Sequence, residues 1–180
     1  MLAYPDPPLV GDGFVLRPFH AGDDAAARAF AEDPDTARWV PPLPADDGHG
    51  VVLRFERFRT DGDLLHLVVA DTTDDTYLGE VMLAVGEDDV VEVGCGVVPA
   101  HRGRGLATAA LRLFDRWCVD RLAVPRIQVL VAVANRPGLE LAVRCGFRRE
   151  GVLRSHWSDE GGGRLDVVVL AMLPGEVPAP

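Results

Sequence analysis

The sequence lacks lysine altogether, so all 18 of its basic residues are arginines. They are outnumbered by 28 Asp and Glu residues, which gives a formal net charge of -10 at pH 7. A nucleic-acid-binding surface needs a dense basic footprint, so this composition argues against nucleic-acid binding as the main function. An acidic surface favours a cationic substrate instead.

Long apolar runs are also missing. No stretch approaches the roughly 20 apolar residues that span a bilayer, and residues 1–13 lack the basic start and apolar run of a signal peptide. We therefore predict a cytoplasmic protein with no membrane partner. The length and the 48% hydrophobic content suit one domain over residues 1–180, with a core at about 13–173 and flexible termini.

Cysteine is scarce, and occurs only as Cys95, Cys118 and Cys145. Three cysteines without CxxC spacing fit neither a disulfide framework nor a zinc site, and no metal is predicted. We expect them to be reduced, buried and packed like small apolar residues, in preference to a covalent catalytic role.

The apolar pattern predicts an α/β (α+β) fold with about six to seven strands and about four helices. The predicted strands are 14–19, 64–70, 77–85, 90–98, 127–133, 147–157 and 165–172. The predicted helices are 22–32, 51–59, one that begins at Gly105, and one that Pro137 opens and Gly146 closes. Pro34 should end the first helix, and residues 39–44 should form a loop.

Two glycines, Gly94 and Gly96, interrupt the predicted strand 90–98. Glycine weakens strand pairing and invites a β-bulge, so we expect one there.

The segment HRGRGLATAAL, residues 101–111, places Gly103 and Gly105 beside Arg102 and Arg104 where a strand gives way to a helix. The first amides of a helix lack partners and carry partial positive charge, so a phosphate fits there. The glycines keep side chains away from that backbone, and the arginines add charge at the rim. The segment matches neither GxGxxG nor a GK[ST] loop. A helix that simply begins after a glycine-rich turn is the alternative.

Arg102-x-x-Gly105-x-Ala107 resembles the R/Q-x-x-G-x-G/A coenzyme A pyrophosphate loop of the GNAT N-acetyltransferase superfamily. Other stretches resemble its ribosomal-protein N-terminal acetyltransferase (RimJ/RimL) branch, and the resemblance covers about residues 14–172. These stretches are Leu16-Arg17-Pro18-Phe19, Val91-Glu92-Val93-Gly94, Pro99 to Gly105, Asn135, Gly146-Phe147 and Glu150-Gly151. The resemblance implies a GNAT fold, with a mixed, mostly antiparallel sheet splayed at a central parallel pair, here 90–98 and 127–133.

The resemblance also implies a cofactor site for acetyl-CoA as co-substrate. The residues that it assigns to the pantetheine arm are Cys95, Gly96 and Val97, and those that it assigns to the diphosphate are Arg102, Gly103, Arg104, Gly105, Leu106, Ala107 and Thr108. The Val97 amide is the candidate for polarising the thioester carbonyl. Asn135 resembles a residue that binds the coenzyme or its water, although Asn also begins helices readily.

The implied reaction is direct transfer of the acetyl group to a primary amine. An amine with a pKa near roughly 10.4 must lose a proton first, and Glu92 is the candidate general base. The alternative is that Glu92 is a solvent-facing strand residue. His156 and Asp159 are competing bases.

The sequence departs from the family at two expected proton donors. Gly138 stands where the family often has Ser, and Ala142 stands where many members have a Tyr general acid. Water or a hydroxyl such as Ser155 or Ser158 would then protonate the leaving thiolate. The missing donors also keep a second hypothesis open, a non-catalytic acyl-CoA-binding regulatory module. The acceptor could be a small-molecule amine or a protein N-terminus, and a homodimer is possible.

Overall fold

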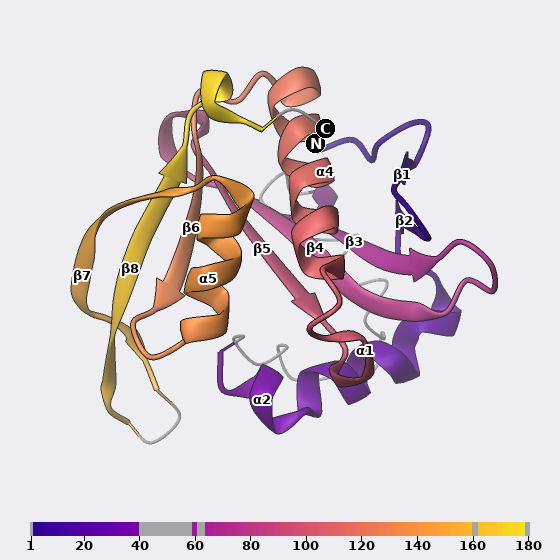
Figure 1. The fold of residues 1–180 in the computed structure, drawn as a ribbon, viewed down its shortest axis with the longest axis horizontal. Helices are drawn as coiled ribbons and strands as arrows, with labels where there is room; N and C mark the ends of the chain where they lie inside the picture. The colour runs from indigo at the N-terminus through magenta and orange to yellow at the C-terminus, as the bar shows by residue number, and fades with distance from the viewer. Residues whose placement is uncertain (1, 40–58, 61–63, 160–161, 179–180) are drawn as a thin grey trace.

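The structure is a computed structural model that describes residues 2–39, 59–60, 64–159 and 162–178 (Figure 1). In these residues eight strands form one sheet in the order β1-β2-β3-β4-β5-β6-β8-β7. The strands are β1 Leu9–Val10, β2 Phe14–Arg17, β3 Leu64–Asp71, β4 Tyr77–Val85, β5 Val91–Val97, β6 Ile127–Ala132, β7 Arg148–Ser158 and β8 Arg164–Met172. Every neighbouring pair is antiparallel except β5 and β6, which are parallel.

The described α-helices connect these strands. They are α1 Asp24–Glu32, α2 Pro34–Ala37, α4 Leu106–Leu122 and α5 Arg136–Cys145. Short 3-10 turns occur at Ala21–Asp23, Glu87–Asp89, Pro99–His101 and Pro174–Glu176. No helix in the described part of the chain has both the length and the apolarity needed to cross a bilayer.

Helices cover both faces of the sheet. Successive side chains of a strand point to opposite faces. The Sγ of Cys95 on β5 lies 3.8 Å from the carbonyl oxygen of Ala107 on α4, whereas a Cβ added at Gly96 would overlap the Phe30 ring of α1. Therefore α4 packs on one face and α1 on the other. Figure 1 shows α4 and α5 in front of the strands, with α1 and α2 near their lower end.

The core on the α4 face is the larger of the two. Its fully buried side chains include Phe14, Leu83, Phe114 and Ile127. A smaller cluster on the α1 face contains Phe19, Ala27, Phe30, Val68, Ala70 and Tyr77. These apolar layers hold the ends of β4 and β5 between α1 and α4.

The predicted fold class is confirmed, with differences in detail. Residues 77–85 form β4 as predicted, and Asn135, Pro137 and Gly146 delimit α5, with Gly146 at φ +106°. The sequence did not reveal β1 or α2. The first helix does end before Pro34, but Pro34 is itself the first residue of α2, because Asp33 caps its amides. The predicted helix 51–59 and loop 39–44 lie largely outside the described residues.

The predicted bulge in β5 is wrong. The pairing of β4 with β5 runs without interruption from Gly79↔Val97 to Val85↔Val91. The irregularity lies instead between β3 and β4, at Val69/Ala70. The glycines of β5 serve close packing, because a Cβ at Gly94 would come 3.1 Å from the Met82 Cγ and one at Gly96 would overlap Phe30.

The chain ends make more contacts than the predicted flexible termini would. The Arg59 guanidinium donates to the Leu2 carbonyl at 2.8 Å, and Leu2 and Tyr4 pack against the core. At the other end, Arg116 of α4 donates to the carbonyls of Val177 and Pro178. The described termini are therefore docked on the domain.

Candidate active site

The sheet opens between its two parallel strands. The register of β5 with β6 contains only Val91↔Ile127 and Glu92↔Gln128. Beyond this point β5 stays paired with β4 as far as Val97, and β6 stays paired with β8 as far as Ala132. The two strands therefore separate after Glu92, as expected for a sheet splayed at a central parallel pair.

The separation leaves backbone groups of β5 without a strand partner. The Val98 amide donates to the Leu78 carbonyl of β4 at 2.9 Å, and the Val91 amide donates towards β6, to the Arg126 carbonyl, at 3.1 Å. Since backbone polar groups alternate along a strand, Cys95 and Val97 direct theirs towards the opening. Among the described residues, the Val97 amide has no acceptor there. A thioester carbonyl could receive this hydrogen bond.

The turn before α4 has the geometry of an anion site. Gly103 and Gly105 have φ values of +75° and +85°, which glycine adopts without strain. A Cβ at either position would meet nothing within 4 Å, so backbone conformation rather than crowding is the reason for these glycines. The first bond of the helix is from the Ala109 amide to the Gly105 carbonyl at 3.0 Å.

The first amides of α4 are consequently left for a ligand. Those of Leu106, Ala107 and Thr108 precede the first helical hydrogen bond. The N-cap residue Gly105 supplies no side-chain cap, and the first turn contains no acidic residue. The helix dipole adds partial positive charge at this end. The predicted diphosphate site at residues 103–108 fits this geometry.

The two arginines of the turn differ in their contacts. The Arg102 guanidinium donates to the Val97 carbonyl, to Asp33, to Asp35 and to Thr36. Arg104 is exposed and forms no hydrogen bond or ion pair in the described part of the chain. Only Arg104 therefore has its charge free for an anion.

Cys95 and Cys145 are packed against α4, and Cys118 is a buried residue of that helix. The Sγ atoms of Cys95 and Cys145 lie 3.8 Å from the carbonyl oxygens of Ala107 and Thr108, respectively. All three thiols are unpaired. Burial raises the pKa of each, that of Cys145 to about 12. Thiols of this kind remain protonated at neutral pH, which agrees with the predicted packing role.

Glu92 lies where the opening begins. It is the last residue of β5 paired with β6, and its side chain shares a sheet face with Gly96, which is the face that α1 covers. The side chain is half-buried, and burial raises the pKa of its carboxyl. A desolvated carboxylate is a stronger base than one in water, so this environment suits the predicted proton acceptor.

The competing bases lie on the far side of the opening. His156 is on β7, three strands from β5, or about 14 Å at roughly 4.8 Å per strand. The Asp159 carboxylate accepts the Gly163 amide at 2.7 Å in the β7–β8 turn. The Ser158 hydroxyl accepts from Arg164 at 2.8 Å. Glu92 is itself five residues from Val97 along β5, or about 16 Å at roughly 3.3 Å per residue, so distance alone does not rank these candidates.

Asn135 performs the helix-starting role. Its Oδ1 accepts the Gly138 amide at 3.0 Å as the N-cap of α5. A ligand role stays a prediction for its side-chain nitrogen. A Cβ at Gly138 would lie 2.8 Å from that nitrogen, and Ala142 is only 2% exposed in the core. Neither position offers a proton donor.

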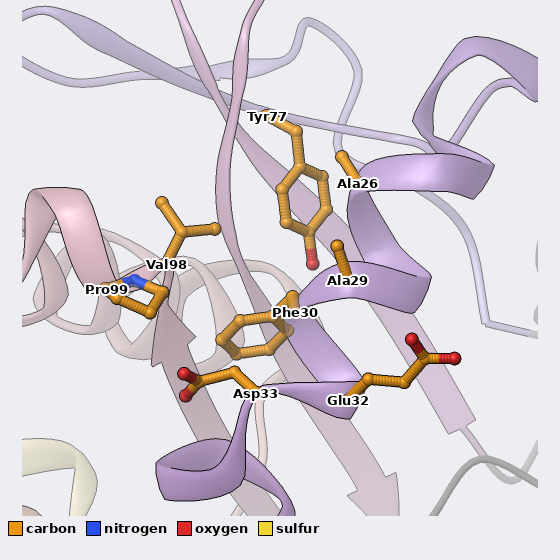
Figure 2. A pocket seen from close by; sticks show the side chains of 8 residues that line it. All are labelled: Ala26, Ala29, Phe30, Glu32, Asp33, Tyr77, Val98 and Pro99. Carbon is orange, nitrogen blue, oxygen red and sulfur yellow. The ribbon is translucent and has the colours of Figure 1, made fainter.

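A hollow of about 490 Å³ lies beside the opening rather than in it (Figure 2). Its lining comes from α1, β4 and the end of β5, and consists of Ala26, Ala29, Phe30, Glu32, Asp33, Tyr77, Val98 and Pro99. The buried Tyr77 hydroxyl has no partner among the described residues, and Figure 2 shows it pointing between Ala29 and Phe30. Within the described residues, no group of three or more His, Cys, Asp or Glu is placed to hold a metal ion.

Charge divides along the chain near the opening. Among the described strands, β1 to β5 contain three Asp and Glu and one Arg, whereas β6 to β8 contain two Asp and Glu and four Arg. The opening therefore separates an acidic part of the sheet from a basic part, an arrangement suited to a cation on one side and an anion on the other.

Comparison with known sequences decides the family. The sequence profile of the acetyltransferase (GNAT) domain matches residues 14–148. The chain belongs to the GNAT acetyltransferase family. This range contains the separating parts of β5 and β6, the turn before α4 and Asn135.

Individual relatives are distant. The probable N-acetyltransferase YjcK of Bacillus subtilis is 29% identical over 121 residues, which are 66% of either protein. Mycobacterium smegmatis RimJ, solved with CoA-disulfide, superposes with a TM-score of 0.79 at 25% identity, over 96% of this chain and 88% of RimJ. The chain spans about half to two thirds of the length of the curated relatives that it matches.

A further solved structure has a similar fold but a low sequence identity to this chain. Spermidine N-acetyltransferase from Vibrio cholerae, solved with CoA and spermine, has a TM-score of 0.80 at 21% identity, over 93% of this chain and 99% of that protein. These comparisons confirm the predicted fold and family.

Sequence reasoning missed the partners of Arg102. Asp33 caps α2 by accepting the Thr36 amide, and the local pattern Asp-Pro-Asp-Thr is a recognisable N-terminal helix signal. That signal predicts the cap, but not the contact with a residue far along the chain.

Proposed function

We propose that this GNAT domain transfers the acetyl group of acetyl-CoA directly to a primary amine. The observation that supports this most strongly is that the opening runs along β5 and leads to the free amides beyond its C-terminal end. Strand pairing stops after Glu92↔Gln128, and the uncapped amides of α4 follow the same strand. The relatives solved with CoA or CoA-disulfide have the same fold.

The cofactor would be held mainly by backbone. The amides of residues 103–108 would bind the diphosphate, Arg104 would add charge at the rim, and the free backbone groups of Cys95 together with the Val97 amide would bind the pantetheine arm. The bound thioester supplies the activated acetyl group. The Val97 amide would then donate to its carbonyl oxygen and stabilise the negative charge that develops during attack.

Glu92 would take a proton from the acceptor ammonium, directly or through a water, so that the neutral amine can attack. As the C–N bond forms, the bond to sulfur breaks. Water or a side-chain hydroxyl protonates the leaving thiolate, because Gly138 and Ala142 provide no acid. A thiolate is a tolerable leaving group without an assigned acid.

A cationic acceptor fits the acidic part of the sheet. RimJ is among the similar structures, and the Vibrio cholerae relative was solved with spermine, so a protein N-terminus of the RimJ/RimL type and a small polyamine are both reasonable acceptors. We further propose a single domain and a possible homodimer, with no nucleic-acid or membrane partner. The three free thiols support a cytoplasmic location.

The direct test is amine-dependent release of CoA, measured with a panel of amines, peptides and aminoglycosides. Glu92→Gln should lower kcat/KM by about 100-fold or more, the range for loss of a general base. The control is Glu87→Gln, because Glu87 is an exposed carboxylate outside β5. Failure of the wild type to bind acetyl-CoA and to use any acceptor would overturn the proposal.

A second function, an acyl-CoA-binding regulatory module without turnover, is favoured by one observation. The two positions where the family often carries proton donors are a helix-start glycine and a buried alanine. This alternative expects a large thermal shift with acetyl-CoA, no transfer, and no effect of Glu92→Gln.

A further inference from the structure

The Arg102 side chain connects three elements that are distant in sequence. Its Nε donates to the Val97 carbonyl at 3.0 Å. Its Nη2 donates to Asp33 Oδ2 at 2.7 Å and to Thr36 Oγ1 at 2.9 Å, and its Nη1 donates to Asp35 Oδ2 at 3.4 Å. These are four of the five hydrogen bonds that a guanidinium can donate. The N–H groups of the Arg102 guanidinium are therefore largely engaged with acceptors of the protein.

The acceptors on the helix side are fixed in place. The same Asp33 oxygen that faces Arg102 accepts the Thr36 amide and the Thr36 hydroxyl, each at 2.9 Å, as the N-cap of α2. Thr36 is 5% exposed. In Figure 2 the Asp33 carboxylate points to the side of the view where Pro99 lies, and the neighbouring Glu32 carboxylate points the opposite way. Arg102 is therefore hydrogen-bonded to the junction of α1 and α2.

The ionisation of Asp33 agrees with this contact. The hydrogen bond from Arg102 is the largest cause that lowers the pKa of the Asp33 carboxyl. The carboxylate is therefore charged wherever the protein is folded at neutral pH. A charged, hydrogen-bonded partner holds a guanidinium more firmly than a neutral one.

On the strand side the acceptor is the Val97 carbonyl. It belongs to the peptide between Val97 and Val98, one peptide after the one that carries the Val97 amide. The peptide between Val97 and Val98 is held at both polar ends, since its N–H donates to the Leu78 carbonyl and its C=O accepts from Arg102. The Val97 amide belongs to the preceding peptide, whose Gly96 carbonyl faces β4 by the same alternation, so Arg102 adds a restraint on its direction from the following peptide. Without Arg102, the end of β5 would be tied to β4 alone.

We infer that Arg102 is a positioning residue for acetyl transfer: it ties the end of β5 to the α1–α2 junction, aims the Val97 amide, and leaves the diphosphate to backbone groups. This inference rests on the proposed function. It replaces the sequence-based assignment of the Arg102 side chain to the cofactor. The motif arginine acts through Val97 rather than through phosphate.

Four variants test this role: Arg102→Lys, Arg102→Ala, Asp33→Asn and, as the control, Arg121→Ala, at an exposed arginine in the last turn of α4. Lysine keeps the charge but cannot span Val97 and Asp33 together. We expect both Arg102 variants to lower kcat at least tenfold while the CoA Kd, measured by calorimetry, changes less than threefold. Asp33→Asn should lower kcat to a smaller extent. Arg121→Ala should leave kcat unchanged.

The opposite pattern would overturn the inference. If Arg102 bound the diphosphate, Arg102→Ala would raise the CoA Kd tenfold or more, Arg102→Lys would retain most of the affinity, and Asp33→Asn would not reduce kcat. Thermal unfolding of each variant, with and without CoA, separates these effects from loss of the fold. Should Arg102→Ala fail to fold, Arg102→Lys and Asp33→Asn carry the comparison.

A spectroscopic measurement keeps the inference testable even if no acceptor is found. Acetyl-CoA labelled with ¹³C at the carbonyl should show a lowered C=O stretching frequency when bound to the wild type, because the Val97 amide polarises it. In Arg102→Lys the shift should be smaller at equal saturation. An unchanged shift would overturn the positioning role, whereas absent turnover with this shift intact would overturn only the proposed acetyl transfer.

Discussion

The most unusual ionisable group in the fold is Asp115, in the middle of α4. Its side chain is 0% exposed, and neither of its oxygens has a hydrogen-bond partner in the described part of the chain. Burial raises the pKa of this carboxyl well above its ordinary value. A charge in such a place would be very costly, so the folded protein holds the neutral acid.

This makes a signed prediction for stability against pH. In the unfolded chain the Asp115 carboxyl has a pKa of about 3.9. Above that pH the folded chain binds one more proton at Asp115 than the unfolded chain does. The free energy of unfolding then falls as pH rises, by up to about 1.4 kcal/mol per pH unit, until the pKa of the folded state is passed. Carboxyls with lowered pKa, such as Asp33, have the opposite slope and lose their contribution as pH falls.

Asp115→Asn removes the titration and keeps the size of the side chain. Both the amide and the neutral acid leave polar atoms unpaired, so we expect equal stability within about 1 kcal/mol near pH 4. Above pH 4 the variant should become progressively more stable than the wild type. The upper limit of its advantage at pH 7 is about 4 kcal/mol, which is three pH units at the slope above.

The assay is urea unfolding of both proteins at intervals between pH 4.5 and 7.5. The control is Asp120→Asn, because Asp120 is an exposed residue of the same helix. Taking differences from the wild type cancels the other carboxyls. A difference for Asp115→Asn that is constant with pH would show that Asp115 titrates alike in the folded and unfolded chains, and would refute the reasoning.

Three further predictions concern β5 and the turn after it. Gly96→Ala should destabilise the fold by about 1–3 kcal/mol in urea unfolding, because the added methyl overlaps Phe30; Gly94→Ala should cost less, since its neighbour is a flexible methionine. Gly105→Ala should weaken CoA binding in calorimetry by roughly five- to thirtyfold, as the φ of +85° costs an L-residue about 1–2 kcal/mol; unchanged affinity would contradict the anion site. In a pH profile, kcat/KM should rise with pH through a pKa above the ordinary glutamate value, because burial raises that of Glu92, and Glu92→Gln should abolish this rise.

The parts of the fold that the sequence revealed depend on local signals. The alternation in residues 77–85 and the Pro and Gly that bracket α5 are each contained in a short window. The same is true of the turn at Gly103 and Gly105, whose positive φ values only glycine adopts easily. The anion site could therefore be proposed from eleven consecutive residues.

The parts that the sequence did not reveal depend on contacts between distant residues. The glycines of β5 were expected to mark a bulge, but their reason is the Phe30 ring packed over Gly96 from another element. The partner of Arg102 is 69 residues away. The sequence of the turn cannot show whether Arg102 binds phosphate or Asp33, because the residues around it would be the same in either case.

The position of the opening also explains why the charge division matters for catalysis. Acetyl-CoA is an anion and an amine acceptor is a cation, so a surface of uniform sign would attract one and repel the other. Here the break in strand pairing falls where the acidic part of the sheet meets the basic part. Each substrate can then approach from the side that attracts it, and both meet at β5. Since the proposed carbonyl donor, the Val97 amide, and the proposed base, Glu92, both belong to this strand, a change that shifts β5 should impair both proposed steps together.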